Sequence, residues 1–121
     1  MHVTAHDLPF ESEQHPLSQR WAVMEDDGEA AWLYLSEPGT TKPAAACFLY
    51  DRRDVSVQDA EPSVHFRWSV NGNSVAALIE GRVIGFIAES HPLGFSSAVT
   101  SVGPRGNPMN LELYEKTFRA T

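Results

Sequence analysis

The sequence predicts a mainly β fold of the α+β class, an antiparallel meander or sandwich of about six to seven strands with a C-terminal helix packed on it. Two turn signals and one change of hydrophobic period lead to this prediction. Asp27-Gly28 and Asn71-Gly72 each separate two apolar runs, and both dipeptides favour the positive φ angles of two-residue hairpin turns. After Asn110, apolar residues recur at the three- and four-residue spacing of a helix instead of at alternate positions.

The first predicted hairpin joins residues 21–26 to residues 29–36 through Asp27-Gly28. Counting outward from this turn gives three cross-strand pairs: Asp26 with Glu29, Val23 with Trp32, and Trp21 with Tyr34. The pairs that contain aromatic rings stabilise antiparallel strands. The pair of carboxylates is destabilising, so this tip is either freely solvated or kept for a partner.

The second predicted hairpin turns at Asn71-Gly72, and a third strand follows through a turn at Glu80-Gly81. The pairs on its apolar face are Trp68 with Val75, Phe66 with Ala77, and Val64 with Ile79. The third strand adds Ile84 beside Ala77 and Phe86 beside Val75 on that face. The pairs on the other face are Arg67 with Ala76 and His65 with Leu78. The turns and the hydrophobic alternation predict the same register.

Shorter elements surround these hairpins. Residues 44–50 form a further predicted strand, and residues 95–101 another. In the predicted helix, Leu111, Tyr114 and Phe118 share the face that packs on the sheet, and Asn110 caps the N-terminus. Residues 1–18 are polar, and we expect them to form a partly ordered N-terminal arm of a single domain that spans residues 1–121.

Charge and composition exclude several classes of function. The chain carries 16 acidic and 9 basic residues, a formal net charge of -7, which disfavours binding to nucleic acids and to anionic membranes. The same charge suits a basic protein partner, or serves solubility alone. The sequence has no signal-peptide pattern and no apolar stretch of membrane-spanning length, and Cys47 has no second cysteine for an intramolecular disulfide. We therefore expect a cytoplasmic protein.

The acidic tip of the first hairpin contains Glu25, Asp26, Asp27 and Glu29. These carboxylates lack the alternate spacing and the closing bidentate glutamate of a calcium loop. Catalysis by a carboxylate pair requires an apolar pocket around one acid, and a hairpin tip is usually hydrated. The remaining interpretations are a solvated turn and a partner-docking surface.

Four aromatic residues form the other notable set: Trp21, Trp32, Tyr34 and Trp68. Tryptophans on a sheet are highly buried on average, so we expect these rings to belong to the core. If the rings of the first hairpin face outward instead, they form a binding platform for a protein or a sugar.

No group of residues indicates catalysis, a metal or a cofactor. The three histidines of the N-terminal arm lack the spacing of a metal motif. Ser90-His91 lacks the G-x-S-x-G turn that exposes a nucleophilic serine. Cys47 has no basic neighbour that would activate its thiol, and we expect a small buried side chain.

Two segments resemble a known family. Residues 24–29, which contain E-D-D-G-E, are followed by Tyr34, and residues 68–72 read W-S-V-N-G before an apolar run through Leu78-Ile79. This pattern is similar to a family of small uncharacterised bacterial proteins, a domain of unknown function, with an E-D-D-G-E hairpin and a W-S-x-D/N-G turn. The chain departs from it at Ala30-Ala31, where the family has Thr-Gly. The resemblance implies a bacterial origin and no particular activity.

The leading hypothesis is a non-enzymatic protein-binding module, similar to an immunity protein or inhibitor, that uses the acidic hairpin against a basic partner. In it the four acidic residues steer the partner, and Trp32 or Tyr34 supplies an apolar anchor. The alternative is a small-molecule-binding protein or enzyme with a pocket between sheet and C-terminal helix, lined by His65, Arg67 and Tyr114. A homodimer joined through edge strands is a third hypothesis.

Overall fold

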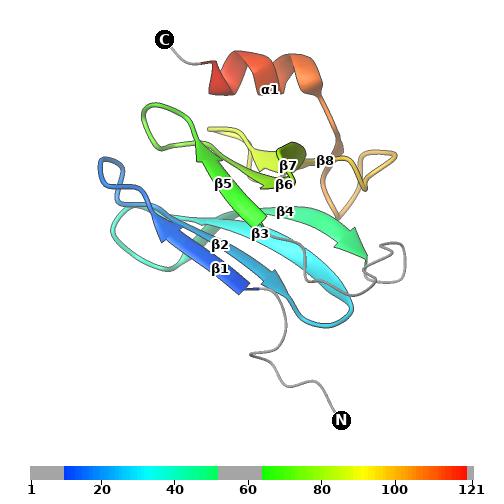
Figure 1. Cartoon of the computed structure of the whole chain (residues 1–121), viewed down its shortest axis with the longest axis horizontal. Coiled ribbons are helices and arrows are strands. Elements are labelled where there is room, and N and C mark those ends of the chain that lie inside the picture. Colours follow the sequence, from blue (N-terminus) through cyan, green and yellow to red (C-terminus); the bar gives the residue numbers. More distant parts are fainter. Residues whose placement is uncertain (1–9, 52–63, 120–121) are drawn as a thin grey trace.

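The computed structural model describes residues 10–51 and 64–119 (Figure 1). Within these residues the chain forms two sheets and one helix. The first sheet contains, in spatial order, β1 (Phe10–Gln14), β2 (Trp21–Asp26), β3 (Ala30–Ser36) and β4 (Pro43–Asp51). The second sheet contains, in spatial order, β5 (Val64–Trp68), β6 (Val75–Ile79), β7 (Arg82–Ile87), β8 (Phe95–Ser96) and β9 (Asn107–Pro108). Helix α1 (Leu111–Phe118) follows β9.

The two sheets lie face to face, and α1 covers the outer face of the second sheet (Figure 1). The fold therefore has three layers, and the predicted mainly β architecture with a C-terminal helix is confirmed. The strand pairs are antiparallel except for β8 and β9, which pair in parallel. No helix in the described part of the chain has the length and apolar character needed to cross a membrane.

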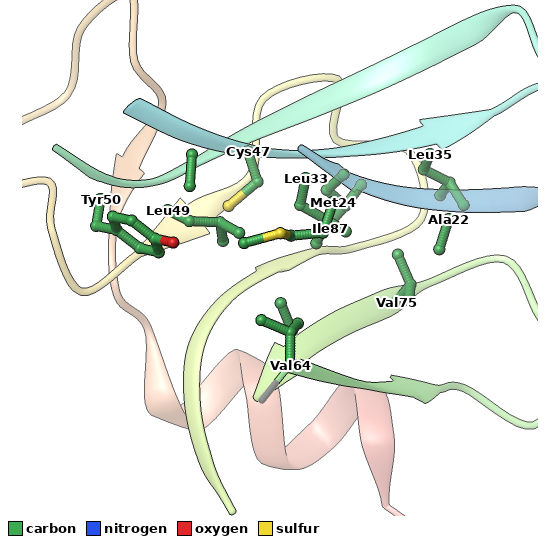
Figure 2. Close-up of a cluster of buried hydrophobic side chains, with 12 residues drawn as sticks. Ala22, Met24, Leu33, Leu35, Cys47, Leu49, Tyr50, Val64, Val75 and Ile87 are labelled. Carbon is green, nitrogen blue, oxygen red and sulfur yellow. The ribbon is translucent and has the colours of Figure 1, made fainter. Parts of the chain in front are cut away.

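The main core lies between the inner faces of the two sheets (Figure 2). Successive side chains of a strand point to opposite faces, so every second residue of β2 and β3 enters this core. These inward residues are Ala22, Met24, Ala31, Leu33 and Leu35. The second sheet contributes Val64, Val75, Ala77 and Ile87 from the other side.

The predicted register of the second hairpin is confirmed, with Val64 opposite Ile79, Phe66 opposite Ala77 and Trp68 opposite Val75. The connection is wider than a two-residue turn, because it closes through a bond of 3.0 Å from Ser69 N to Ser74 O. The register is unaffected, since the wider loop is centred on the same dipeptide, Asn71-Gly72.

The turn after β6 is also confirmed, because Glu80 and Gly81 have φ angles of 51° and 77°, which fit a type I′ turn. A β-bulge between Ala77 and Leu78 then shifts the pairing of β6 with β7 by one residue. The predicted pairs of β7 are therefore wrong: Ala77 lies opposite Gly85, Val75 opposite Ile87, and Phe86 opposite Ala76. A slip of one residue moves a side chain to the other face, so Phe86 packs under α1 and not in the main core.

The predicted register of the first hairpin is wrong by two residues. The observed pairs are Asp26 with Ala31, Glu25 with Trp32, and Val23 with Tyr34. The turn is centred on Gly28-Glu29, one residue later than predicted, and Gly28 has the positive φ angle of 96°. A slip of two residues leaves every side chain on its own face, so hydrophobic alternation does not detect it.

Strand β4 joins the two sheets. Ala46 forms a parallel bridge with Leu93, in which Ala46 N donates to Pro92 O at 3.1 Å and Gly94 N donates to Ala46 O at 2.8 Å. A side chain at position 94 has no room, because its Cβ would lie 2.4 Å from Cβ of Cys47. The close approach at Gly94 thus allows the backbone of one sheet to bond to the other.

The extent of three elements can be compared with the sequence. The strand predicted at residues 44–50 is confirmed as β4. Of the strand predicted at residues 95–101, only Phe95–Ser96 forms a strand. Residues 10–14, within the segment assigned to the N-terminal arm, form β1 and pair with β2 at the edge of the first sheet.

Helix α1 begins after Asn110, whose Oδ1 accepts a bond of 2.9 Å from Leu113 N, as the capping prediction requires. Tyr114 and Phe118 are buried against Phe86 of the second sheet. Leu111 was predicted on the same buried face, but its side chain is 59% exposed. It lies in the first turn of α1, outside the buried cluster that Tyr114 and Phe118 form.

These two ends of α1 allow a matched test of the packing. We predict that Phe118→Ala lowers the free energy of unfolding by about 3 kcal/mol, because it removes a buried ring. Leu111→Ala should change it by less than about 0.5 kcal/mol, because that side chain is exposed. Urea unfolding of both variants measures the difference, and equal losses would contradict the packing of α1.

The burial of Cys47 gives a second prediction. The side chain is 0% exposed, and burial raises the pKa of its thiol to about 12. Because the thiolate is the reactive form, the native protein should not react with an aromatic disulfide reagent at about pH 8. In denaturant the same thiol should react fully. A native reaction as fast as that of a free thiol would show that the core opens around Cys47.

Candidate functional site

The outer face of the first sheet is the candidate site. On β2 and β3 the inward positions hold the core, so the residues between them point away from the second sheet. These outward residues are Trp21, Val23, Glu25, Ala30, Trp32 and Tyr34, and all but the exposed Glu25 are half-buried. The expectation that Trp21, Trp32 and Tyr34 belong to the core is therefore wrong. Trp68 alone of the four aromatic residues packs against the main core.

The aromatic rings on this outer face support one another. Trp32 stacks on Tyr34 with ring centroids 6.4 Å apart, and its edge contacts Phe48 at 5.3 Å. The guanidinium of Arg105 lies 4.4 Å from the centroid of the Phe48 ring. Phe48 is covered by these contacts and is only 2% exposed. The rings of Trp32 and Tyr34 are thus held in place by packing and do not depend on a partner for their position.

A groove runs across this face beside Tyr34. Its volume is about 390 Å³, and its lining combines apolar side chains with one carboxylate. The lining residues are Trp21, Val23, Glu25, Tyr34, Ser36, Thr41 and Pro43. Thr41 and Pro43 come from the loop after β3 and the start of β4, so the groove is built from three segments of the first sheet.

The four carboxylates of the acidic tip differ in their exposure and in their hydrogen bonds. Asp26 is 3% exposed, because it lies on the inward face of β2. Its Oδ2 accepts a bond of 3.0 Å from Tyr50 Oη, and its Oδ1 accepts one of 2.8 Å from Gly28 N. Asp26 was expected on the docking surface, and its burial removes it from that role.

Asp27 is exposed, but its carboxylate shapes the turn. Its Oδ1 accepts bonds of 2.9 Å from Glu29 N and from Ala30 N, and Asp27 N donates to Ala30 O at 3.1 Å. The bonds from Ala30 N and then Glu29 N lower the pKa of the Asp27 carboxyl. The side chain replaces the Asp27 carbonyl in the hairpin ladder, which explains why the turn is centred one residue later than predicted.

The exposed acids make the surroundings of Tyr34 negative. Partial burial raises the pKa of the Tyr34 hydroxyl first, and the carboxylates of Glu25 and Asp27 raise it further. Glu25 and Glu29 are exposed, and no ion pair or hydrogen bond of either side chain occurs within the described residues. The site therefore combines fixed aromatic rings with carboxylates that are open to a partner.

Two of the three residues predicted to line a pocket between sheet and helix bond to each other instead. Arg67 Nη1 donates to Tyr114 Oη at 2.9 Å, and Arg67 Nη2 donates to Phe118 O at 2.8 Å. The guanidinium also lies over both rings, 5.6 Å from the centroid of Tyr114 and 6.0 Å from that of Phe118. Arg67 and Tyr114 are thus brought together to fasten α1 on the second sheet. His65 is exposed on β5 and enters none of these contacts.

The remaining chemistry of the described residues is limited. No group of three or more histidine, cysteine, aspartate or glutamate residues in ranges 10–51 and 64–119 is arranged to hold a metal ion. Cys47 is buried, as the sequence predicts. His91 Nδ1 bonds to Glu89 O at 3.0 Å, and within the described residues it forms no hydrogen bond with the hydroxyl of Ser90.

Comparisons with protein-family models, with curated proteins and with solved structures found no match for this chain. The resemblance to a bacterial family of unknown function therefore stays a prediction.

Sequence reasoning missed Val23, Thr41 and Pro43 as parts of the site, whereas Trp21 belongs to the outward-facing alternative for the rings of the first hairpin. A signal for Val23 is present, because Glu25 shares its alternation on β2 and charged residues favour the solvated face. Asp26 is the next residue of the strand and points to the opposite face, however, so each face of β2 carries one carboxylate. Alternation alone therefore does not decide which face is exposed.

The role of Asp27 in the turn yields a test. We predict that Asp27→Ala lowers the melting temperature more than Asp27→Asn, because asparagine keeps an oxygen that accepts the two amide bonds. The pKa of Asp27 is lowered in the folded protein, so its contribution is present above pH 3.8, the ordinary value, and is lost as the pH falls below it. Melting curves from neutral to acidic pH measure both effects. Equal melting temperatures for the two variants would contradict this role.

Proposed function

We propose that this chain is a non-enzymatic protein-binding module whose outer face of the first sheet docks a basic protein partner. The observation that carries the proposal is the groove beside Tyr34, which the rings of Trp21 and Tyr34 and the carboxylate of Glu25 line together. Such a surface matches a lysine or arginine side chain, which has an apolar stem and a charged head.

The groove offers a separate contact for each part of such a side chain. Val23 and Pro43 supply apolar surface for the stem. Trp21 and Tyr34 supply aromatic rings. A cation over the face of such a ring is attracted by about 0.5–2 kcal/mol, depending on hydration. Glu25 supplies the opposite charge. Aromatic anchors of this kind dominate the binding energy of many protein interfaces.

Charge complementarity favours a basic protein over a second copy of this chain. The net charge of -7 and the exposed carboxylates at Glu25, Asp27 and Glu29 attract a basic partner and accelerate its association. Two copies would repel each other, and Glu11 and Glu13 on the edge strand β1 disfavour edge-to-edge pairing. An acidic single domain that covers the site of a basic protein acts as an immunity protein or inhibitor does.

The test uses two charge reversals that change the net charge equally. We expect Glu25→Arg/Glu29→Arg, beside the groove, to lose the basic proteins that the native chain retains from lysate of its own host. Glu112→Arg/Glu115→Arg, on the exposed side of α1, should retain them. Mass spectrometry identifies the retained proteins, and titration calorimetry with one purified partner should show a loss of about tenfold or more in affinity.

The two variants separate local recognition from general attraction of charge. Equal loss of partner in both variants would mean that only the net charge matters. Retention by Glu25→Arg/Glu29→Arg would remove the outer face of the first sheet from the interface. High salt should weaken the native complex, because exposed charges are screened.

A further inference from the structure

A second groove, separate from the outer face of the first sheet, opens where the ends of the two sheets meet. Its volume is about 280 Å³, and it shares no lining residue with the groove beside Tyr34. Leu35, Ala45 and Ile87 give it an apolar lining, and Arg20, Glu89 and Ser90 add polar groups. The lining comes from both sheets and from the loop after β7, so only the folded sandwich forms it.

Arg20 is held in this groove by neutral groups. Its Nε donates to Asn73 Oδ1 at 3.0 Å, and its Nη1 donates to Ser36 O at 2.9 Å. Within residues 10–51 and 64–119 no carboxylate forms an ion pair with it, although the chain has 16 acidic residues. A guanidinium has five N–H donors, so the Nη2 group remains available to a ligand.

The other polar groups of the groove define the charge of that ligand. The hydroxyl of Ser90 has no hydrogen bond within the described residues and adds a donor, on a residue whose φ angle is 71°. The carboxylate of Glu89, which accepts a bond of 3.3 Å from Asn71 Nδ2, also lines the groove. His91, whose Nδ1 bonds to Glu89 O at 3.0 Å, lines the groove as well. A single negative charge on the ligand pairs with Arg20, and the carboxylate of Glu89 disfavours a second.

We propose that this groove binds a monocarboxylate with a short apolar body. Arg20 holds the carboxylate through the free N–H donors of its Nη2 group, which form charge-assisted hydrogen bonds with it. Leu35, Ala45 and Ile87 contact the apolar body. The carboxylate belongs either to a free organic acid or to the C-terminus of a peptide, since both present the same group. The site does not depend on the protein-binding role of the other groove.

The experiment follows the amide signals of the isotope-labelled chain by NMR during titration with defined probes. Hexanoate represents a free acid, N-acetyl-leucine represents a peptide C-terminus, and hexanamide and phosphate are controls. We expect saturable shifts for residues that line the groove with at least one carboxylate probe, and none with hexanamide or phosphate at the same concentrations. The carboxylate probe that binds more tightly identifies the source.

Two variants test the residues. Arg20→Gln should weaken binding of the carboxylate probe by about tenfold or more, whereas Arg82→Gln, at an exposed arginine of β7, should leave it unchanged. Ala45→Leu fills the groove and keeps Arg20 in place, so it should abolish binding in a chain that is still folded. This variant decides the matter if Arg20→Gln does not fold.

Several results would overturn the proposal. Equal shifts with hexanoate and hexanamide would show apolar contact without recognition of charge. Equal binding of phosphate would show attraction of any anion. Undiminished binding in both Arg20→Gln and Ala45→Leu, or no saturable shift with either carboxylate probe, would show that this groove is not a carboxylate site.

Discussion

The alternation of side chains along β2 and β3 is the constraint on which the rest of the structure depends. Small and aliphatic residues such as Ala22 and Leu33 occupy the inward positions, where they pack against the second sheet. The pleat then forces the intervening residues outward, and Trp21 and Tyr34 therefore lie on the opposite face. The alternation of the two strands thus places one set of side chains in the core and the other set along the aromatic groove. A side chain that moved from one set to the other would have to move to the opposite face of the sheet.

The two sheets are held together differently along their length. At β4 the contact is made by backbone bonds through Ala46, and it requires the close approach at Gly94. Elsewhere side chains connect the sheets: Arg20 bonds to the loop after β5, and Trp68 Nε1 donates to Glu13 Oε1. The groove around Arg20 occurs among such side-chain contacts, where the ends of the sheets are bridged by polar groups and not closed by backbone.

The acidic tip shows how one short run of like residues serves several purposes. The carboxylate of Asp26 is buried against Tyr50, and that of Asp27 bonds to the amides of its own turn. Glu25 and Glu29 remain exposed. A carboxylate that accepts hydrogen bonds from amides and hydroxyls stabilises the conformation of the hairpin. An exposed carboxylate without such bonds contributes negative charge to the surface. The binding surface consequently depends on the rings and on the exposed acids together.

The sequence by itself determined the elements whose signals are local. Asn110 specifies the start of α1 through its own side chain, and Asn71-Gly72 specifies the register of β5 and β6 through the adjacent backbone. The tertiary structure decided the rest. The bulge at Ala77 turns Phe86 toward α1, and each face of β2 carries an acid, so only the docking of the second sheet determines which face is exposed. The groove around Arg20 gathers residues from distant segments, and their proximity arises only when the two sheets pack.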